Sequence, residues 1–486
     1  MSEIKVNKIS PRTACGTVTL GDSGDTIALG SGASQTGFGR TGTVDWQTTI
    51  KTGDFTASNG EGYFVDTSSG GVTVTLPSSP SAGNIIAVKD YANTADTNNI
   101  TIARNGSNID GTAANALITN EGGSVTLVFA DSTKGWLPTD AAQKSDISFP
   151  EFIQATGGTV TTVCTNFKVH TFTGPGTFCV SNAGNAAGSN TVSYVVVGGG
   201  GGSENNEGSG GGGAGGYRES RAASDSYTAS PLNATSGPGY NLPVSVQGYP
   251  IAVGGGGTAG TGDNGIGTPC SAATAGVASS FSTISSAGGG KGGRGNSPNN
   301  APATPLLTGG NGGSGGGAGG RMGCTPSPSP AAPGGSGNTP SVSPPQGNNG
   351  GNGMSAENPS NDRGSGGGGA TAVGATSPGG VPAPAGDGGA GATSSINGTP
   401  TARAGGGGGG AYSTGTTDGG GGAGGAGGGG TGGSTTPSPG GNTGTNGAPN
   451  TGGGAGGGSA SPSGVPFPSS GSGGGSGIVI IRYKFQ

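Results

Sequence analysis

The side chains that could carry out chemistry are few in this 486-residue sequence, and they are scattered along it. His170 is the only histidine, and it lies between Val169 and Thr171 in an alternating stretch typical of a β-strand. We interpret His170 as a surface or partly packed strand residue, because the sequence has no nucleophile elbow that would make it part of a catalytic triad. We therefore expect no enzyme activity.

The cysteines do not form a metal-binding or redox motif. None of the five belongs to a CxxC pair, and a single histidine cannot complete a ligand set, so we expect no metal site and no cofactor. Free thiols are the simplest interpretation for a chain made in a reducing cytoplasm. The cysteines are Cys15, Cys164, Cys179, Cys270 and Cys324.

The charge balance excludes several classes of partner. The 19 basic and 24 acidic residues give a net charge of −5 without a basic stripe, so we expect no binding to nucleic acid. No stretch approaches the roughly 20 apolar residues that span a bilayer, so we expect no membrane insertion. The start, "MSEIKVNKISPR", has no apolar core of a secretory signal. Because paired carboxylates leave little local signature, polysaccharide hydrolysis remains an alternative.

The elements that must position these side chains are unevenly distributed. Glycine accounts for 120 residues and proline for 32, and most of the glycine follows residue 197. We expect a mainly β chain with essentially no α-helix. Its predicted parts are an N-terminal attachment segment and short β shaft at 1–40, an antiparallel β-sandwich at 41–143, a β base at 144–197, a glycine-rich bundle at 198–477 and a closing β-strand at 478–486.

Evenly spaced alternating segments predict the sandwich. Its expected strands are 62–66, 72–76, 84–90, 99–104, 124–129 and 135–137. Its expected core residues are Trp46, Phe64, Ile86, Val88, Leu127 and Trp136.

Two further patterns concern the β base. The sequence "FKVHTFTGPGTFCV" (167–180) alternates and then turns at "GPG", which predicts a β-hairpin. Continuous apolar runs at 194–197 and 478–483 predict buried strands that lie side by side, with the glycine region inserted between them.

Several glycine runs have a period of three, as in "TGGNGGSGG" (308–316). An extended left-handed helix has three residues per turn and no internal hydrogen bonds, so its backbone needs neighbouring helices as partners. We expect an ordered bundle of such helices. A flexible linker is the alternative, since Gly/Ser-rich chains are usually coils. The runs begin near residues 198, 210, 254, 288, 309, 350, 364, 386, 404, 419, 452 and 471.

The sequences "FKVHTFTGPGTFCV", "VSYVVVGGGGG" and "GGGSGIVIIRY" resemble the glycine-rich terminal domain of bacteriophage tail fibres and adhesins. The front part, with "VTLGDSGDTIALGSG", is similar to tail fibres of marine phages, especially those of cyanobacteria. The resemblance implies N-terminal β fibre modules followed by a polyglycine-II bundle, and host-receptor binding without catalysis. The receptor would be a polysaccharide or an outer-membrane protein. The virion would be the location, after synthesis in the host cytoplasm.

The remaining expectations concern assembly and the binding site. We expect a homotrimer that attaches to other virion tail proteins through its N-terminal region. If the runs alternate in direction, the segments expected at the far tip are 203–209, 258–285, 321–349, 370–385, 411–418 and 459–470, whereas 217–253 lies at the base. The side chains expected to contact the receptor are Arg321, Met322, Tyr412 and Phe467. The alternative functions are a non-binding structural or decoration protein of the virion and a polysaccharide-degrading tailspike.

Overall fold

Short strands form most of the regular structure in the computed structural model, and the expectation of a mainly β chain is confirmed. The structure describes residues 44–140, 149–204, 208–261, 271–295, 304–320, 331–354, 363–378, 383–412, 419–435, 443–459 and 471–486. Within these ranges the helical element is one turn, α1 (Thr304–Leu307). The predicted shaft at 1–40 lies outside the described residues.

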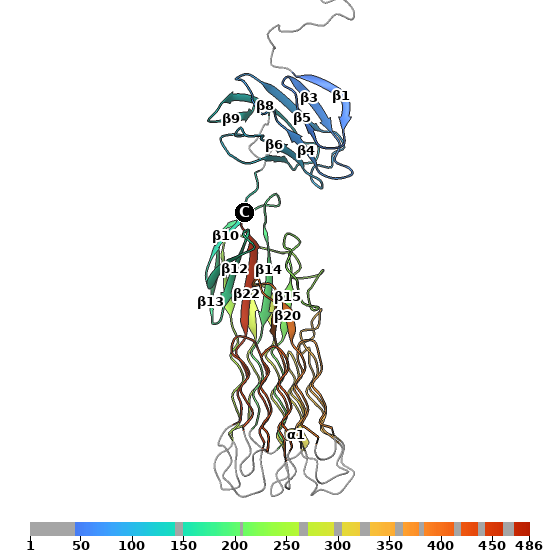
Figure 1. The fold of residues 1–486 in the computed structure, drawn as a ribbon, viewed down its shortest axis with the longest axis vertical. Coiled ribbons are helices and arrows are strands. Elements are labelled where there is room, and N and C mark those ends of the chain that lie inside the picture. The colour runs from blue at the N-terminus through green and yellow to red at the C-terminus, as the bar shows by residue number, and fades with distance from the viewer. Residues whose placement is uncertain are drawn as a thin grey trace, which may run out of the picture. The chain divides into compact units, whose positions relative to one another are not determined.

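The chain divides into two units, which we call the front unit (Met1–Ser148) and the glycine unit (Phe149–Gln486). In the front unit two sheets pack together (Figure 1). The first contains, in spatial order, β1 (Asp45–Lys51), β3 (Glu61–Val65), β5 (Ile85–Asp90), β8 (Ser124–Asp131) and β9 (Gly135–Pro138). The second contains β2 (Phe55–Thr56), β4 (Val72–Thr75), β6 (Ile100–Ala103) and β7 (Ala116–Ile118).

The prediction that this module is antiparallel is wrong for its first half. Successive strands alternate between the two sheets, so that β1, β3 and β5 pair in parallel, as do β2, β4 and β6. Antiparallel pairing begins only with β6–β7 and β5–β8. Alternating side chains identify a strand with one buried face, but they do not specify its partner or direction.

The position of Trp46 also differs from the prediction. Ile86, Val88, Leu127 and Trp136 are buried as expected, whereas Trp46 is 41% exposed and Phe64 is partly buried. Trp46 belongs to β1, which lies at the edge of its sheet. An edge strand has only one neighbour to cover its side chains, which explains the exposure.

A β-sandwich forms the base of the glycine unit (Figure 1). One sheet has the order β11 (Thr159–Val163), β12 (Phe167–Phe172), β22 (Ile478–Lys484), β14 (Thr191–Val197) and β15 (Tyr217–Ser220), and β16 (Leu242–Pro243) also pairs with β14. The other has the order β10 (Ile153–Thr156), β13 (Gly176–Ala183), β17 (Gly248–Ala252), β18 (Ser279–Phe281) and β19 (Ile284–Ser286). A separate hairpin joins β20 (Ala392–Ser394) to β21 (Thr401–Arg403).

The strand that enters the glycine region and the strand that leaves it are neighbours, as the sequence predicts. Val197 of β14 is opposite Ile478 of β22 in an antiparallel register. The predicted hairpin at 167–180 is wrong, because β12 pairs with β11 and β22 whereas β13 pairs with β10 and β17. The "GPG" turn therefore carries the chain from one sheet to the other.

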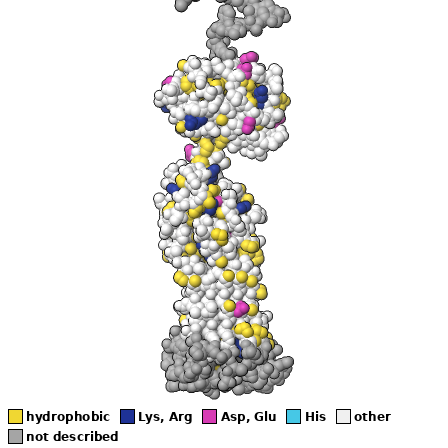
Figure 2. Space-filling view, viewed as in Figure 1, with side chains coloured by type: hydrophobic (Ala, Val, Ile, Leu, Met, Phe, Trp, Pro, Cys, Tyr) yellow, Lys and Arg dark blue, Asp and Glu magenta, His cyan; other side chains and the backbone are white. Residues whose placement is uncertain are grey.

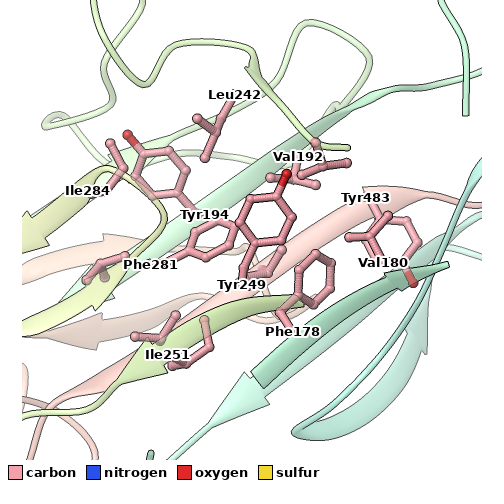
Figure 3. Packing of buried hydrophobic residues seen from close by; sticks show 14 of the residues in the cluster. Phe178, Val180, Val192, Tyr194, Leu242, Tyr249, Ile251, Phe281, Ile284 and Tyr483 are labelled. Carbon is pink, nitrogen blue, oxygen red and sulfur yellow. The ribbon is translucent and has the colours of Figure 1, made fainter. Parts of the chain in front are cut away.

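Aromatic side chains fill the space between the two sheets (Figure 3). Phe178 contacts Phe281 edge to face, with ring centroids 6.0 Å apart, and Tyr194 and Tyr249 pack around the same centre. On the other face of the β14–β22 sheet, a second cluster includes Val195, Val197, Tyr217, Tyr227 and Ile396. The central strands β14 and β22 are thus covered on both faces, which explains their continuous apolar sequences.

His170 lies inside the sandwich core, so the prediction of a surface or partly packed position is wrong. Its side chain is fully buried and lies edge-on to Phe178. Nδ1 is 2.7 Å from the carbonyl oxygen of Gly157 and therefore donates to it, which leaves Nε2 to accept from the Tyr483 hydroxyl at 3.1 Å. Burial lowers the pKa of the imidazole, although the Gly157 hydrogen bond opposes the shift.

We expect this histidine to make the stability of the glycine unit depend on pH. The pKa of His170 is lower in the folded chain than the value of about 6.5 in the unfolded chain. As the pH falls below that unfolded value, His170 binds a proton in the unfolded chain but not in the folded chain. Protonation therefore favours unfolding, and the stability decreases. The melting temperature between pH 7.5 and 5.5 should fall more in the wild type than in His170→Phe. Equal slopes would contradict the prediction.

Candidate functional site

The glycine region forms a lattice of extended runs that leave the sandwich and return to it (Figure 1). We call it the glycine lattice, its end next to β14 and β22 the sheet end, and the opposite end the far end. Its runs in the described part of the chain are 198–204, 208–216, 254–261, 271–278, 287–295, 306–312, 313–320, 331–337, 346–354, 363–370, 372–378, 383–391, 404–412, 419–425, 429–435, 443–448, 452–459 and 471–477.

Hydrogen bonds between runs follow a period of three. In the run 198–204, Gly199 and Gly202 both donate to 271–278, at 2.9 and 3.0 Å, and the residues that follow each of them donate to 471–477. A helix with three residues per turn places its N–H groups in three directions, so residues three apart reach the same neighbour. The backbone supplies both donors and acceptors, and no apolar side chain is needed to hold the runs together.

Interior runs are surrounded on every side. The run 198–204 donates to three runs and accepts from three others. These neighbours are 208–216, 271–278 and 471–477 as acceptors, and 254–261, 287–295 and 452–459 as donors. The run 208–216 has a comparable set, including the parallel run 363–370, to which Gly211 and Ala214 donate. The lattice is thus hydrogen-bonded in all directions perpendicular to its axis.

In a run on the outside of the lattice, the period of three determines which residues face solvent and which face neighbouring runs. In 254–261 the residues Gly255 and Thr258 are exposed, whereas Gly254, Gly257 and Gly260 are buried. A Cβ atom on Gly257 would lie 2.1 Å from the carbonyl oxygen of Thr274, but nothing lies within 4 Å of one on Gly255. Side chains are therefore accommodated on one face of an outer run and excluded from the others.

A few polar or larger side chains lie near the far end of the lattice among the described residues. Tyr412 ends the run 404–412 and is 2% exposed, and Arg363 begins the run 363–370 and is 3% exposed. Burial lowers the pKa of the Arg363 guanidinium. Nearby, the backbone N–H of Gly419 donates to the hydroxyl oxygen of Thr435 at 3.1 Å. These side chains are thus packed within the lattice and are not free in solvent.

Two exposed apolar side chains also lie at the far end, and the sequence analysis did not identify them. Leu306, in α1, is 45% exposed, and Met354, at the end of the run 346–354, is 38% exposed. Figure 1 shows α1 at the far end, and Leu307 packs with Ala332, whose carbonyl oxygen accepts from Gly353. A large apolar residue at the end of a run of small residues is the signal that could have identified them.

The predicted site residues are only partly described. Tyr412 lies at the far end, as expected, but most of its surface is buried; its contact with a receptor stays a prediction. Arg321, Met322 and Phe467 lie outside the described residues.

Three of the predicted tip segments contain residues that are at the sheet end instead. These are 258–285 and 321–349, through β18–β19 and the turn before Gln346, and 370–385, through Ala370, which packs in the same cluster as Val197. The turn near Ala370 consists of the same small residues as the runs, and in the other two segments the residues that turn the chain at the sheet end lie within longer stretches that were assigned to the tip as a whole. The segment 217–253 is at the sheet end as predicted, since its strands pair with β13 and β14.

The surface of the lattice is chemically plain. On the face seen in Figure 2 it carries few charged side chains. The charged side chains of the lattice include Lys291 and the buried Glu204, which form an ion pair at 3.9 Å. Within the described ranges no group of three or more His, Cys, Asp and Glu side chains could hold a metal ion. No helix among the described residues is long and apolar enough to cross a membrane. Cys164 and Cys179 are free and exposed.

No protein-family model matches the chain, and no curated protein matches it either. The functional assignment therefore rests on the geometry of the structure.

Proposed function

We propose that this chain is a tail-fibre adhesin of a bacteriophage, and that the far end of its glycine lattice binds a receptor on the host surface. The observation that supports the proposal is the lattice itself. Backbone hydrogen bonds to as many as six neighbours hold the run ends in fixed relative positions. A surface fixed in this way loses little conformational entropy on binding.

The sites of sequence change in such a lattice are restricted, which also supports a binding role. Most interior glycines exclude even a methyl group, so outer faces and run ends tolerate variation best. A chain that must recognise different receptors can then change its far end without changing its scaffold. Recognition of a receptor by such a surface does not require catalysis.

Leu306 and Met354 are the described residues that we expect to contribute most. Exposed apolar side chains that become buried at an interface each contribute up to about 1.5–3 kcal/mol. The receptor is a polysaccharide or an outer-membrane protein. In the proposal the fibre is a homotrimer attached to the virion through the N-terminal region, and trimerisation increases avidity because several far ends bind one cell together.

The test uses the full chain and its binding to host cells. Leu306→Ser with Met354→Ser should weaken saturable binding about tenfold or more and should weaken competition with phage adsorption equally. Val373→Ser is the matched control, because Val373 is 62% exposed but lies three residues beyond Ala370, near the sheet end.

Three results would count against the proposal. The first is a wild-type chain that binds no host cell, which favours the structural or decoration role. The second is equal loss of binding in the Val373→Ser control. The third is release of reducing sugar from host polysaccharide, which favours a tailspike.

A further inference from the structure

The front unit carries an exposed tryptophan and a partly buried phenylalanine beside a hollow. Trp46 and Phe64 stack with ring centroids 4.8 Å apart and an interplanar angle of 29°. The hollow measures about 350 Å³, and its lining includes Trp46, Phe64, Lys89, Ser124, Thr126 and Asp140. Its volume falls within the range of about 300–1,000 Å³ that is typical of small-ligand sites.

The indole of Trp46 is held in place although it is exposed. Trp46 is opposite Gly62 across β1 and β3, and a Cβ atom on Gly62 would lie 2.8 Å from the indole ring. The absence of that Cβ lets the ring lie against β3, and the Phe64 ring stacks on the indole. A rigid aromatic surface of this kind offers contact area at a low cost in conformational entropy.

The polar groups of the hollow differ from those of an apolar protein interface. Ser124 and Asp140 are exposed, and Thr126 and Lys89 are partly exposed, so hydroxyl, carboxylate and ammonium groups are all near the aromatic pair. The Lys89 ammonium donates to the carbonyl oxygen of Gly122, which fixes its position. Hydroxyl groups both donate and accept hydrogen bonds, and they match this mixture of donors and acceptors.

We propose that this hollow binds a neutral hexopyranose unit of a glycan. The C–H-rich face of a sugar ring would stack on Trp46, and its hydroxyl groups would bond to Asp140, Lys89 and Thr126. A gluco-configured ring fits best, because its equatorial hydroxyl groups leave both faces of the ring apolar. The site belongs to the front unit and is independent of receptor binding by the glycine lattice.

The two tryptophans provide a direct measurement. Trp136 is fully buried and Trp46 is exposed, so in the full chain with Trp136→Phe the fluorescence reports Trp46 alone. Cellotriose and N-acetylchitotriose are the probes. We expect a saturable blue shift of the emission with at least one of them at millimolar concentration. No shift with either probe would overturn the proposal.

Variants distinguish the site from a nonspecific effect, with binding in the otherwise wild-type full chain measured by calorimetry. Trp46→Ala should weaken binding at least tenfold, and Asp140→Asn should weaken it several-fold. Tyr91→Ala is the matched control, because Tyr91 is an aromatic residue of the same unit with 53% exposure and should be replaceable without effect.

Two outcomes of these variants would overturn the proposal. One is unchanged binding in Trp46→Ala with a normal melting temperature. The other is a change in oligomeric state in Trp46→Ala, which would assign the hollow to an interface between copies of the chain. Gly62→Ala retains Trp46 but pushes its indole ring out of position. It should therefore weaken binding, as Trp46→Ala does.

Discussion

Gly257→Ala is expected to lower the melting temperature of the glycine unit, whereas Gly255→Ala in the same run is expected to leave it unchanged or raise it slightly. The added methyl group on Gly257 meets the carbonyl oxygen of Thr274 at 2.1 Å, so the run 271–278 has to move. Overpacking of this kind costs about 1–3 kcal/mol. Nothing lies within 4 Å of a Cβ atom on Gly255. Alanine there reduces the conformational entropy of the unfolded chain, and this stabilises the protein by about 0.4–1 kcal/mol.

Calorimetry of the full chain checks this pair of variants. Gly212→Ala extends the test to an interior run, where the methyl group would lie 2.1 Å from the carbonyl oxygen of Gly201. Equal melting temperatures for Gly255→Ala, Gly257→Ala and Gly212→Ala would show that the runs are not packed as described.

Arg482→Met is expected to destabilise the glycine unit by about 3–5 kcal/mol, because it leaves a buried carboxylate without its partner. Arg482 is 1% exposed, and its Nε is 3.0 Å from Oδ2 of Asp225. The guanidinium also donates to the carbonyl oxygen of Ile396 at 3.2 Å and lies over the ring of Phe167. One side chain of β22 thereby contacts three other segments of the glycine unit.

Unfolding in urea measures the effect, and the comparison with other variants separates charge from packing. Asp225→Asn should be destabilising too, and the double variant should lose less than the sum of the two single losses, because neither charge is then left unpaired. Lys484→Met, also on β22 but only partly buried, is the control. A loss in Arg482→Met no larger than in this control would contradict the prediction.

The sequence predicted strands better than it predicted their pairing. Alternation identified most strands of the front unit because each has one buried face, yet it could not show that β1, β3 and β5 are parallel. The neighbouring strands β14 and β22 could be predicted because each contains a continuous apolar run and the two enclose the glycine region. The "GPG" turn is equally compatible with a hairpin and with a crossing between sheets, and only the partners of β12 and β13 decide between them.

The candidate site was less accessible to prediction for a related reason. Period-three glycine patterns predict extended helices that need neighbours, but they do not reveal where one run ends and the next begins. Ala370 is part of such a turn and differs from residues within the runs only in its packing at the sheet end. The burial of Tyr412 and His170 depends on contacts with residues distant in sequence, which a local pattern does not contain.

The arrangement of hydrogen bonds in the glycine lattice has a mechanical consequence. The bonds of an interior run lie across its axis and connect it to six neighbours. A pull along the axis therefore loads many bonds together in shear, instead of opening them one after another as when a strand is peeled from the edge of a sheet. In the proposed tail-fibre role, tension along this axis would load these bonds together, and the lattice would resist it without an extensive apolar core.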